Sequence, residues 1–243
     1  MRRDGRKHAE MRPVEIEPNY LKYPHGSAMI CCGNTKVICS VIVEEKLPSF
    51  LESKGSPHGW ITAEYALLPA SGTSRNSRAG YGSTMVKGRV HEIQRLIGRA
   101  LRAALDLKKL GPRTLMIDCD VFQADGGTRT ASVTGSMVAL ELAVKKLIAE
   151  GKISESPITS GVAAVSAGIV DGEVLLDLDY KEDSEAETDL NLVMNRAGGF
   201  IEVQGTAEKG IFTRPQLDKM LEIGENGIRK LFEIQGKVLE RFS

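Results

Sequence analysis

Residues 123–137, with the sequence QADGGTRTASVTGSM, combine paired glycines with an arginine and several hydroxyl side chains. They lie where an apolar, strand-like segment gives way to a segment with helical spacing of its apolar residues. A helix start offers unpaired N–H groups and a positive dipole end, and Gly126 and Gly127 let an anion approach the backbone closely. Arg129 adds a planar guanidinium group. The stretch predicts a site for inorganic phosphate or one phosphodiester; the alternative is a glycine turn followed by a threonine helix cap.

No motif in the sequence indicates a side chain that acts as a catalytic nucleophile. The glycine stretch lacks the Gly-Lys-Ser/Thr ending of a nucleotide-binding loop and the Gly-x-Gly-x-x-Gly spacing of a dinucleotide fold. No Gly-x-Ser-x-Gly motif occurs, and no histidine stands in an activating context. If the chain is an enzyme, the nucleophile therefore comes with a substrate, and inorganic phosphate is a candidate.

Arg89 is a second candidate for anion binding. It stands in the first turn of residues 88–110, whose apolar residues predict a helix with one buried face. Arg95, Arg99 and Arg102 form a stripe on the other side, facing water or a partner subunit, whereas Arg89 projects toward the apolar side. A charge there needs an anionic partner, which is either a buried carboxylate or a bound anion.

Acidic residues gather later in the chain. In the segment VLLDLDY, the two-residue period of a strand places Asp177 and Asp179 on one face, and Asp183 and Asp189 follow on either side of a short polar segment. Such carboxylates repel one another unless something cationic joins them. Mg²⁺, which prefers oxygen ligands, is one answer, and a carboxyl group that keeps its proton and acts as a general acid is another. The plain alternative is a solvated acidic loop.

The bulk composition is that of a globular protein with a sizeable core: 243 residues, 42% hydrophobic and 26% charged, with a formal net charge of zero. The charges are nevertheless segregated. Residues 75–102 hold seven basic residues and one acidic residue, Glu92, whereas residues 171–189 hold nine acidic residues and one lysine. A local basic surface binds a polyanion even when the net charge vanishes, so a nucleic-acid partner is compatible with this composition.

We expect a cytoplasmic protein with no membrane partner. No apolar run approaches the roughly 20 residues of a membrane helix, and the first residues lack the apolar core of a secretion signal. The four cysteines include no Cys-x-x-Cys pair and are expected to be small buried thiols, and the four histidines are scattered. A metal bound through sulfur or imidazole is therefore not predicted.

Turn chemistry and hydrophobic spacing predict the elements that position these residues. Strands are expected at residues 28–32, 35–43, 114–122, 161–170, 173–180, 190–195 and 199–204, and helices at 88–110, 130–150 and from a capping box at Thr213 toward Leu239. Residues 47–60 and 69–88 are expected to be loops. Strand pairs interrupted by helices predict an α+β fold with mixed sheets and covering helices. We expect a single domain over residues 1–243, which could comprise two similar halves, about 1–150 and 151–243.

Six segments resemble bacterial members of the ribonuclease PH family, in the same order and over nearly the whole chain. They are NYL (19–21), GWITAEY (59–65), EIQRLIGR (92–99), DCDVFQADGGTRTA (118–131), EDSEAETD (182–189) and EVQGTAE (202–208). The resemblance implies the RNase PH-like fold, also called ribosomal protein S5 domain 2-like. It implies a phosphorolytic 3′-to-5′ exoribonuclease, a tRNA nucleotidyltransferase that trims tRNA precursors toward the CCA end and releases nucleoside diphosphates. Processing or degradation of rRNA is a further role that it allows.

The resemblance also implies roles for particular residues. Phosphate would be held by Arg89, Gly127, Thr128 and Arg129. Asp183 and Asp189 would bind Mg²⁺ or Mn²⁺ and assist the departing ribose 3′ oxygen.

Family members form a ring of six, a trimer of dimers, around a channel. Arg75 and Arg78 would line this channel and hold RNA. The chain departs from the common pattern at Ser74 and Ala79, where threonine and an acid are more usual, and the loop keeps its basic character. Asn191 stands where the related polynucleotide phosphorylase has a lysine.

Two alternatives remain at this point. An inactive RNA-binding ring subunit of the exosome type would keep the fold and the basic channel but lose the chemistry; the joint presence of Arg89, Arg129, Asp183 and Asp189 argues against it. A broad RNA-degrading enzyme without a preference for tRNA is the second alternative.

Overall fold

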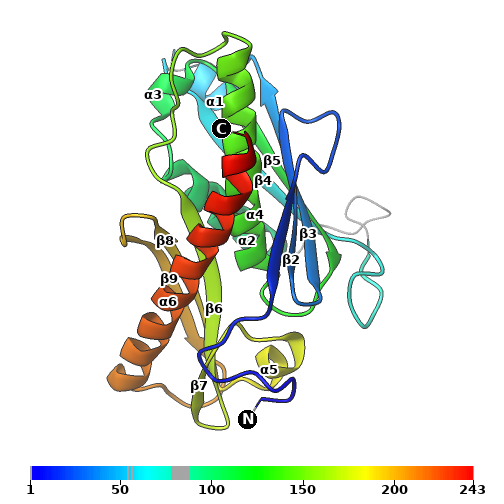
Figure 1. The fold of residues 1–243 in the computed structure, drawn as a ribbon, viewed down its shortest axis with the longest axis vertical. Coiled ribbons are helices and arrows are strands. Elements are labelled where there is room, and N and C mark those ends of the chain that lie inside the picture. The colour runs from blue at the N-terminus through cyan, green and yellow to red at the C-terminus, as the bar shows by residue number, and fades with distance from the viewer. Residues whose placement is uncertain (1, 54, 56, 78–87, 243) are drawn as a thin grey trace.

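The computed structural model describes residues 2–53, 55, 57–77 and 88–242. The described chain forms two β-sheets with a long helix, α4 (Thr128–Ala149), between them (Figure 1). The first sheet has the spatial order β1 (Val14–Pro18), β2 (Gly26–Cys32), β3 (Thr35–Glu44), β5 (Thr114–Gln123) and β4 (Trp60–Leu67). The second has the order β7 (Glu173–Leu176), β6 (Val162–Val170), β8 (Thr188–Asn195) and β9 (Phe200–Ala207). Neighbouring strands are antiparallel except β4 and β5, which are parallel.

Helices complete the layers. They are α1 (Ser49–Glu52), α2 (Gly88–Arg102), α3 (Leu107–Leu110), α4, α5 (Tyr180–Glu185) and α6 (Arg214–Leu239), followed by a 3₁₀ turn at Glu240–Phe242. The molecule is layered as the first sheet, then α4 with α2, then the second sheet, then α6 (Figure 1). The predicted α+β fold with mixed sheets and covering helices is confirmed.

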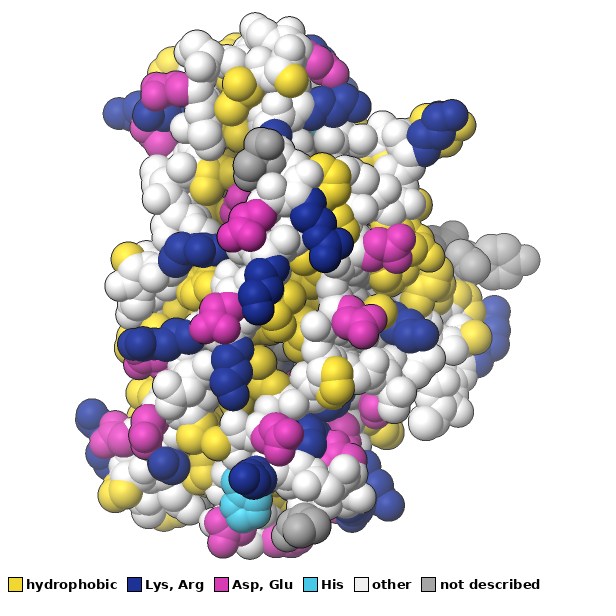
Figure 2. Space-filling model, viewed as in Figure 1, with side chains coloured by type: hydrophobic (Ala, Val, Ile, Leu, Met, Phe, Trp, Pro, Cys, Tyr) yellow, Lys and Arg dark blue, Asp and Glu magenta, His cyan; other side chains and the backbone are white. Residues whose placement is uncertain are grey.

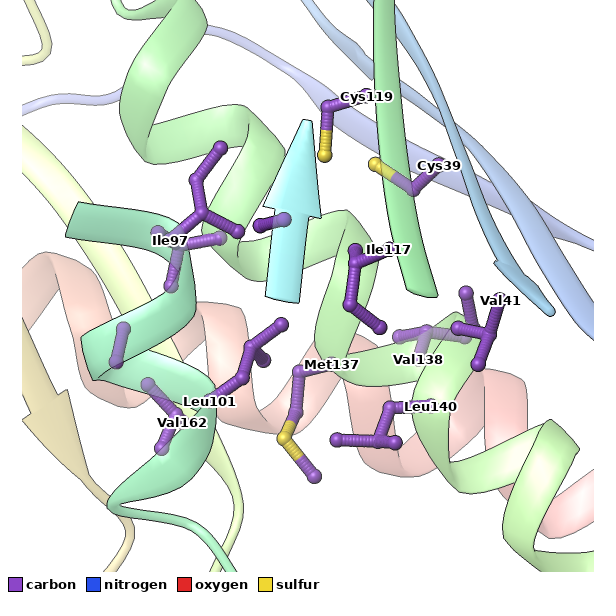
Figure 3. Packing of buried hydrophobic residues seen from close by; sticks show 14 of the residues in the cluster. Cys39, Val41, Ile97, Leu101, Ile117, Cys119, Met137, Val138, Leu140 and Val162 are labelled. Carbon is purple, nitrogen blue, oxygen red and sulfur yellow. The ribbon is translucent and has the colours of Figure 1, made fainter. Parts of the chain in front are cut away.

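The strand pattern explains the layers. In β5, Leu115, Ile117, Cys119 and Val121 are buried on the helix side, and the residues between them face the open side of the first sheet. In β6, by contrast, successive small residues are buried on both faces, because one face packs toward α4 and the other toward α6. Figure 3 shows the main core, where side chains of both sheets and both inner helices meet: Val41, Ile117 and Val162 from the strands, Ile97 and Leu101 from α2, and Met137, Val138 and Leu140 from α4.

Helix α4 is buried more completely than its sequence predicts. Its apolar residues recur every three or four positions, which is typical of a one-sided helix, yet residues 130–140 are all buried because a sheet covers each side. Its polar groups are satisfied internally. Thr134 Oγ1 donates to the carbonyl of Ala164 in β6 (3.2 Å) and accepts from the N–H of Ala164 (3.0 Å). The Gln235 amide of α6 donates to the carbonyls of Thr134 (3.0 Å) and Val162 (3.1 Å), which ties α4, β6 and α6 together.

Several predictions of secondary structure are wrong. The helix expected over residues 88–110 ends at Arg102, and α3 begins separately because the Asp106 side chain accepts from the N–H of Lys108 (3.0 Å). The strand expected over residues 173–180 ends at Leu176, because Asp177 adopts a left-handed conformation (φ +53°) and Asp179 caps α5. Residues 47–60, expected to be a loop, contain α1 and the first residue of β4. Strands β1 and β4 and helix α5 were not predicted.

Other sequence expectations are confirmed, including the turns at residues 33–34 and 171–172 and the capping box formed by Thr213 and Gln216. Cys39 and Cys119 are buried, with their sulfur atoms close together in Figure 3, whereas Cys31 and Cys32 are half-buried.

The arginine stripe of α2 only partly faces water. Arg95 is exposed and Arg99 forms an ion pair with Glu202 of β9 (2.6 Å). Arg102 instead donates to the carbonyl of Ile61 (2.9 Å) and lies over the Trp60 ring, so the prediction for Arg102 is wrong.

On the face that carries α6, basic and acidic side chains are interspersed (Figure 2), and several form pairs one turn apart, such as Arg214 with Asp218. In the described part of the chain, no helix has the length and apolar character needed to span a membrane.

Candidate active site

A cavity of about 420 Å³ lies where the starts of α2 and α4 meet α5 and β8. It is lined by segments from both sheets and by the loop before residue 78. Six residues that the sequence singled out lie together in its wall: Arg89, Gly127, Thr128, Arg129, Asp183 and Asp189. Arg75 lies on the exposed loop whose neighbouring residues line the cavity, and Arg78 is outside the described residues.

The glycine turn leads directly into α4. Gly126 (φ +75°) and Gly127 (φ +65°) both adopt left-handed conformations, and Gly127 is the residue before the first helical residue. A Cβ atom on Gly126 would lie 2.3 Å from the carbonyl oxygen of Leu178, so the turn packs closely against the backbone that leads into α5.

The start of α4 has no side-chain cap from any described residue and no acidic residue in its first turn. The Thr130 hydroxyl donates to the carbonyl of Gly127 (2.9 Å) and so does not cap an N–H group. The alternative of a threonine-capped turn is therefore wrong. Helices α3, α5 and α6 are each capped by a side chain, whereas the N–H groups of α4 remain able to bind an anion.

Arg129 is held in place by two residues that the sequence analysis did not predict. Its Nη1 donates to Gln204 Oε1 of β9 (3.0 Å) and lies 3.4 Å from Glu92 Oε2 of α2. Gln204 Nε2 in turn donates to Glu92 Oε1 (3.3 Å). Glu92 is the single acid within the basic segment of residues 75–102. Its position among basic residues was the one feature of the sequence that could have indicated its contact with an arginine.

Arg89 is exposed at the cavity wall and not buried, which corrects the expectation that it projects into the apolar side. It occupies the second position of α2, where the helix has not yet reached the core. Within the described residues it forms no ion pair with a carboxylate. Its positive charge, together with that of Arg129, acts on Asp183 and opposes the increase in the pKa of that carboxyl group caused by burial. Of the two partners expected for Arg89, a bound anion fits this position.

Asp183 and Asp189 form an electrostatically strained pair. Burial raises the pKa of Asp183. Burial also raises the pKa of Asp189, and the nearby charge of Asp183 raises it further, against the opposing effects of Arg129 and a hydrogen bond from Asn191. The Asn191 amide donates to both Asp189 oxygens, at 3.3 and 3.1 Å. The repulsion between the two carboxylates is relieved if they share a proton or bind a cation together.

The donor set fits Mg²⁺ or Mn²⁺ better than a metal that prefers sulfur or nitrogen. Asp183 and Asp189 offer only oxygen atoms, and the described residues hold no cluster of three or more metal-ligating side chains. Mg²⁺ commonly binds through one or two carboxylates and completes its coordination with water and substrate phosphate. An ion held by these residues would therefore depend on the substrate for some of its ligands.

Asp177 and Asp179 do not belong to this pair. Asp177 is buried and accepts from Arg12 through Nε (3.0 Å) and Nη2 (2.6 Å), and Asp179 accepts from backbone N–H groups at the start of α5. Burial opposes the charge on Arg12, but its contacts with Asp177 raise the pKa of the guanidinium group, which stays charged.

Two further buried arginines hold the same region. Arg2 forms an ion pair with Glu182 and donates to the carbonyls of Leu176 and Asp177 at 2.7 and 2.9 Å. Arg6 donates to the carbonyl of Asp177 at 2.9 Å. These three arginines, called here the N-terminal clamp (Arg2, Arg6 and Arg12), fix the backbone that leads to Asp183. The clamp could not be predicted from the sequence, because its partners at Leu176, Asp177 and Glu182 lie more than 160 residues away.

Tyr65 supports the phosphate side of the cavity. Its hydroxyl lies 2.8 Å from Thr128 Oγ1, and the ring is buried in the cavity wall. Burial raises the pKa of this phenol, so it stays protonated and can donate a hydrogen bond.

Known proteins match this chain over most of its length. Residues 10–146 match the model of the 3′ exoribonuclease family, domain 1, and residues 161–227 match domain 2 of that family. Ribonuclease PH of Bacillus pumilus is 53% identical over 245 residues, covering 99% of this chain and all of the relative. Ribonuclease PH of Syntrophomonas wolfei is 52% identical over 238 residues, covering 98% of each chain.

A solved structure, the Archaeoglobus fulgidus exosome with RNA bound to the active site, has a TM-score of 0.78 and 24% identity, covering 96% of this chain and 91% of that chain. This likeness supports the predicted fold. The matches to relatives confirm the prediction of a phosphate-dependent exoribonuclease. This chain belongs to the ribonuclease PH family of 3′ exoribonucleases.

Proposed function

We propose that the chain removes nucleotides one at a time from the 3′ ends of tRNA precursors, beyond the CCA end, and uses inorganic phosphate to release nucleoside diphosphates. The observation that carries this proposal is a shared cavity in which the start of α4 and two arginines lie with two half-buried carboxyl groups, those of Asp183 and Asp189. An anion site beside a cation or proton site suits the transfer of a nucleotidyl group from one oxygen atom to another, which relies on the same positioning and charge stabilisation as phosphoryl transfer.

The phosphate would be bound by Arg89, Arg129 and N–H groups of the glycine turn and the start of α4, among them those of Gly127 and Thr128. One phosphate oxygen attacks the last phosphorus atom of the RNA while the bond from that phosphorus to the preceding 3′ oxygen breaks. The electron pair goes to the departing 3′ oxygen, which takes up a proton. The protein contributes by positioning and by electrostatic stabilisation. Because one phosphate ester linkage is exchanged for another, excess nucleoside diphosphate should drive the reaction backward.

Asp183 and Asp189 would hold Mg²⁺ or Mn²⁺, which when bound supplies positive charge where negative charge develops on the transferred group. The same two carboxyl groups have raised pKa values because of burial, which also suits them to hold a proton for the departing oxygen. The Asn191 amide keeps the Asp189 carboxylate oriented toward the cavity.

The RNA would approach along the loop that carries Arg75, with Arg78 as a second contact. We also propose that the chain works as one catalytic unit, because residues from both sheets line the same cavity. Assembly into a hexameric ring and a cytoplasmic location complete the proposal.

The test is release of nucleoside diphosphate from a tRNA with extra 3′ nucleotides, in Mg²⁺, with and without phosphate. Wild type should form product only with phosphate, and Arg129→Ala should lower kcat/KM for phosphate by about 10- to 150-fold, the range for a lost hydrogen bond to a charged group. Arg95→Ala, which removes an exposed arginine of α2, is the matched control and should leave the rate unchanged. Monophosphate formed without phosphate would indicate hydrolysis. RNA binding without any product would favour the inactive RNA-binding subunit. Equal rates on the extended tRNA and on unstructured RNA would favour a broad RNA-degrading enzyme.

A further inference from the structure

The two glycines of the phosphate turn create a conformational problem. Gly126 and Gly127 lack a side chain and both have positive φ, so the peptide groups around them can rotate between orientations at low cost. In one orientation an N–H group faces the cavity and attracts an anion. In the other a carbonyl oxygen faces the cavity and repels it. A phosphate site built on this turn therefore needs contacts that hold one orientation.

Thr35, the first residue of β3, provides such contacts. Its side chain is completely buried, and its Oγ1 donates to the carbonyl of Gly126 (2.7 Å) while accepting from the N–H of Asp125 (3.0 Å). Arg12 reinforces them, since Nη1 donates to the carbonyl of Asp125 and Nη2 to that of Gly126 (3.4 Å). Neither Thr35 nor Arg12 lines the cavity.

The direction of the N–H groups follows from peptide geometry. The peptide bonds in the described chain are trans, so the carbonyl and the N–H of one planar peptide group point in opposite directions. When Thr35 and Arg12 hold the carbonyls of Asp125 and Gly126, the N–H groups of Gly126 and Gly127 point away from them. Both glycines line the cavity, and neither N–H has an acceptor among the described residues. These N–H groups are thus available to a ligand.

We propose that Thr35 is a positioning residue for phosphate: with Arg12, its hydroxyl locks the peptide groups of the glycine turn so that two N–H groups face the bound anion. This inference rests on the proposed function, because it assumes phosphate as the guest of the cavity. It adds a residue outside the cavity to the phosphate site. It also gives the buried Arg12 a role at the turn in addition to its ion pair with Asp177.

The test is Thr35→Val, which keeps the shape of the side chain and removes the hydroxyl. The apparent KM for phosphate should rise about tenfold if the competent orientation falls to about a tenth of the molecules, while the KM for RNA stays unchanged. Thr35→Ser, which restores the hydroxyl, should restore the phosphate KM. Thr134→Val is the matched control, because Thr134 is equally buried and also donates to a carbonyl and accepts from an N–H, but lies away from the cavity.

A merely structural role for Thr35 would lower the melting temperature in both valine variants without a selective change in phosphate KM, and that result would overturn the inference. If wild type shows no dependence on phosphate, the proposed function fails instead, so the two failures are distinguishable. Should Thr35→Val not fold, hydrogen exchange of wild type decides the question. Inorganic phosphate should slow amide hydrogen exchange in a peptide spanning residues 124–130. Unchanged exchange at saturating phosphate would overturn the inference that N–H groups of the glycine turn face the bound anion.

Discussion

Replacement of Gly126 by alanine tests how tightly the phosphate turn is coupled to the carboxylate side of the cavity. The new Cβ atom would lie 2.3 Å from the carbonyl oxygen of Leu178 and 2.6 Å from the carbonyl carbon of Asp179, whereas ordinary contacts begin at 3.4 Å. The turn and the segment leading to α5 must therefore separate by about 1 Å, since a packed interior cannot absorb the overlap. A misplacement of about 1 Å costs about 100-fold in rate. We expect kcat/KM to fall by that factor.

Gly172→Ala is the matched control for this experiment. Gly172 has the same φ of +75° as Gly126, but a Cβ atom there would meet nothing within 4 Å. Both variants should lose about 1–2 kcal/mol of stability, the cost of left-handed backbone in a residue with a side chain. Gly126→Ala should lose about 1–3 kcal/mol more, because its Cβ atom overlaps the backbone of residues 178 and 179. Only Gly126→Ala should lose activity, measured as phosphate-dependent release of nucleoside diphosphate at saturating RNA. Equal activity of the two variants would refute the reasoning, because it would show that the approach of the turn to α5 does not set the geometry of catalysis.

Three other outcomes are expected. Gln235→Leu should lower the free energy of unfolding by about 2 kcal/mol, because two buried carbonyls lose their donor; urea denaturation measures this, and an unchanged midpoint would mean that other donors replace the amide. Burial raises the pKa of Glu141, against the opposing charges of Arg196 and Lys145, so the folded state binds the proton more tightly and stability falls as the pH rises through the folded pKa. Glu141→Gln should therefore have the higher melting temperature at neutral pH and no advantage in acid, where both states are protonated; a lower melting temperature at neutral pH would contradict this. Finally, EDTA should abolish diphosphate release and added Mg²⁺ should restore it, whereas full activity in EDTA would exclude the proposed role of Asp183 and Asp189 as metal ligands.

Local patterns were sufficient for much of the fold. The alternation in β5, the turns at residues 33–34 and 171–172 and the Thr213 capping box each depend on interactions within a few residues, so the sequence carries them directly. The glycine turn and the candidate residues of the cavity were also predicted, the glycines from their conformational freedom and Asp183 and Asp189 from the spacing of the resemblance. Their common place in one cavity is an outcome of the structure.

Contacts between distant segments explain most of what was not predicted. Asp177 reads as a strand residue, but Arg12, 165 residues earlier, binds its carboxylate where the strand has ended. Arg89 reads as a misplaced charge on an apolar face, but α2 begins at the cavity wall, where that face is open. The apolar spacing of α4 predicts a helix with one buried face, because the sequence does not indicate that a sheet covers each side of it. For Asp177 and α4, segments far along the chain decide the outcome, and for Arg89 the decisive feature is the cavity at the start of α2.

The N-terminal clamp can form only after a late part of the chain has been synthesised. Arg2 is joined to a residue 180 positions later and Arg12 to one 165 positions later, so these early residues must wait for their partners during translation. At about 5–20 residues per second, the wait is roughly 8–30 s for Arg12. During that interval three guanidinium groups stay hydrated and the backbone leading to Asp183 does not yet exist. A growing chain on the ribosome therefore cannot complete this cavity before residues 177–189 have been synthesised.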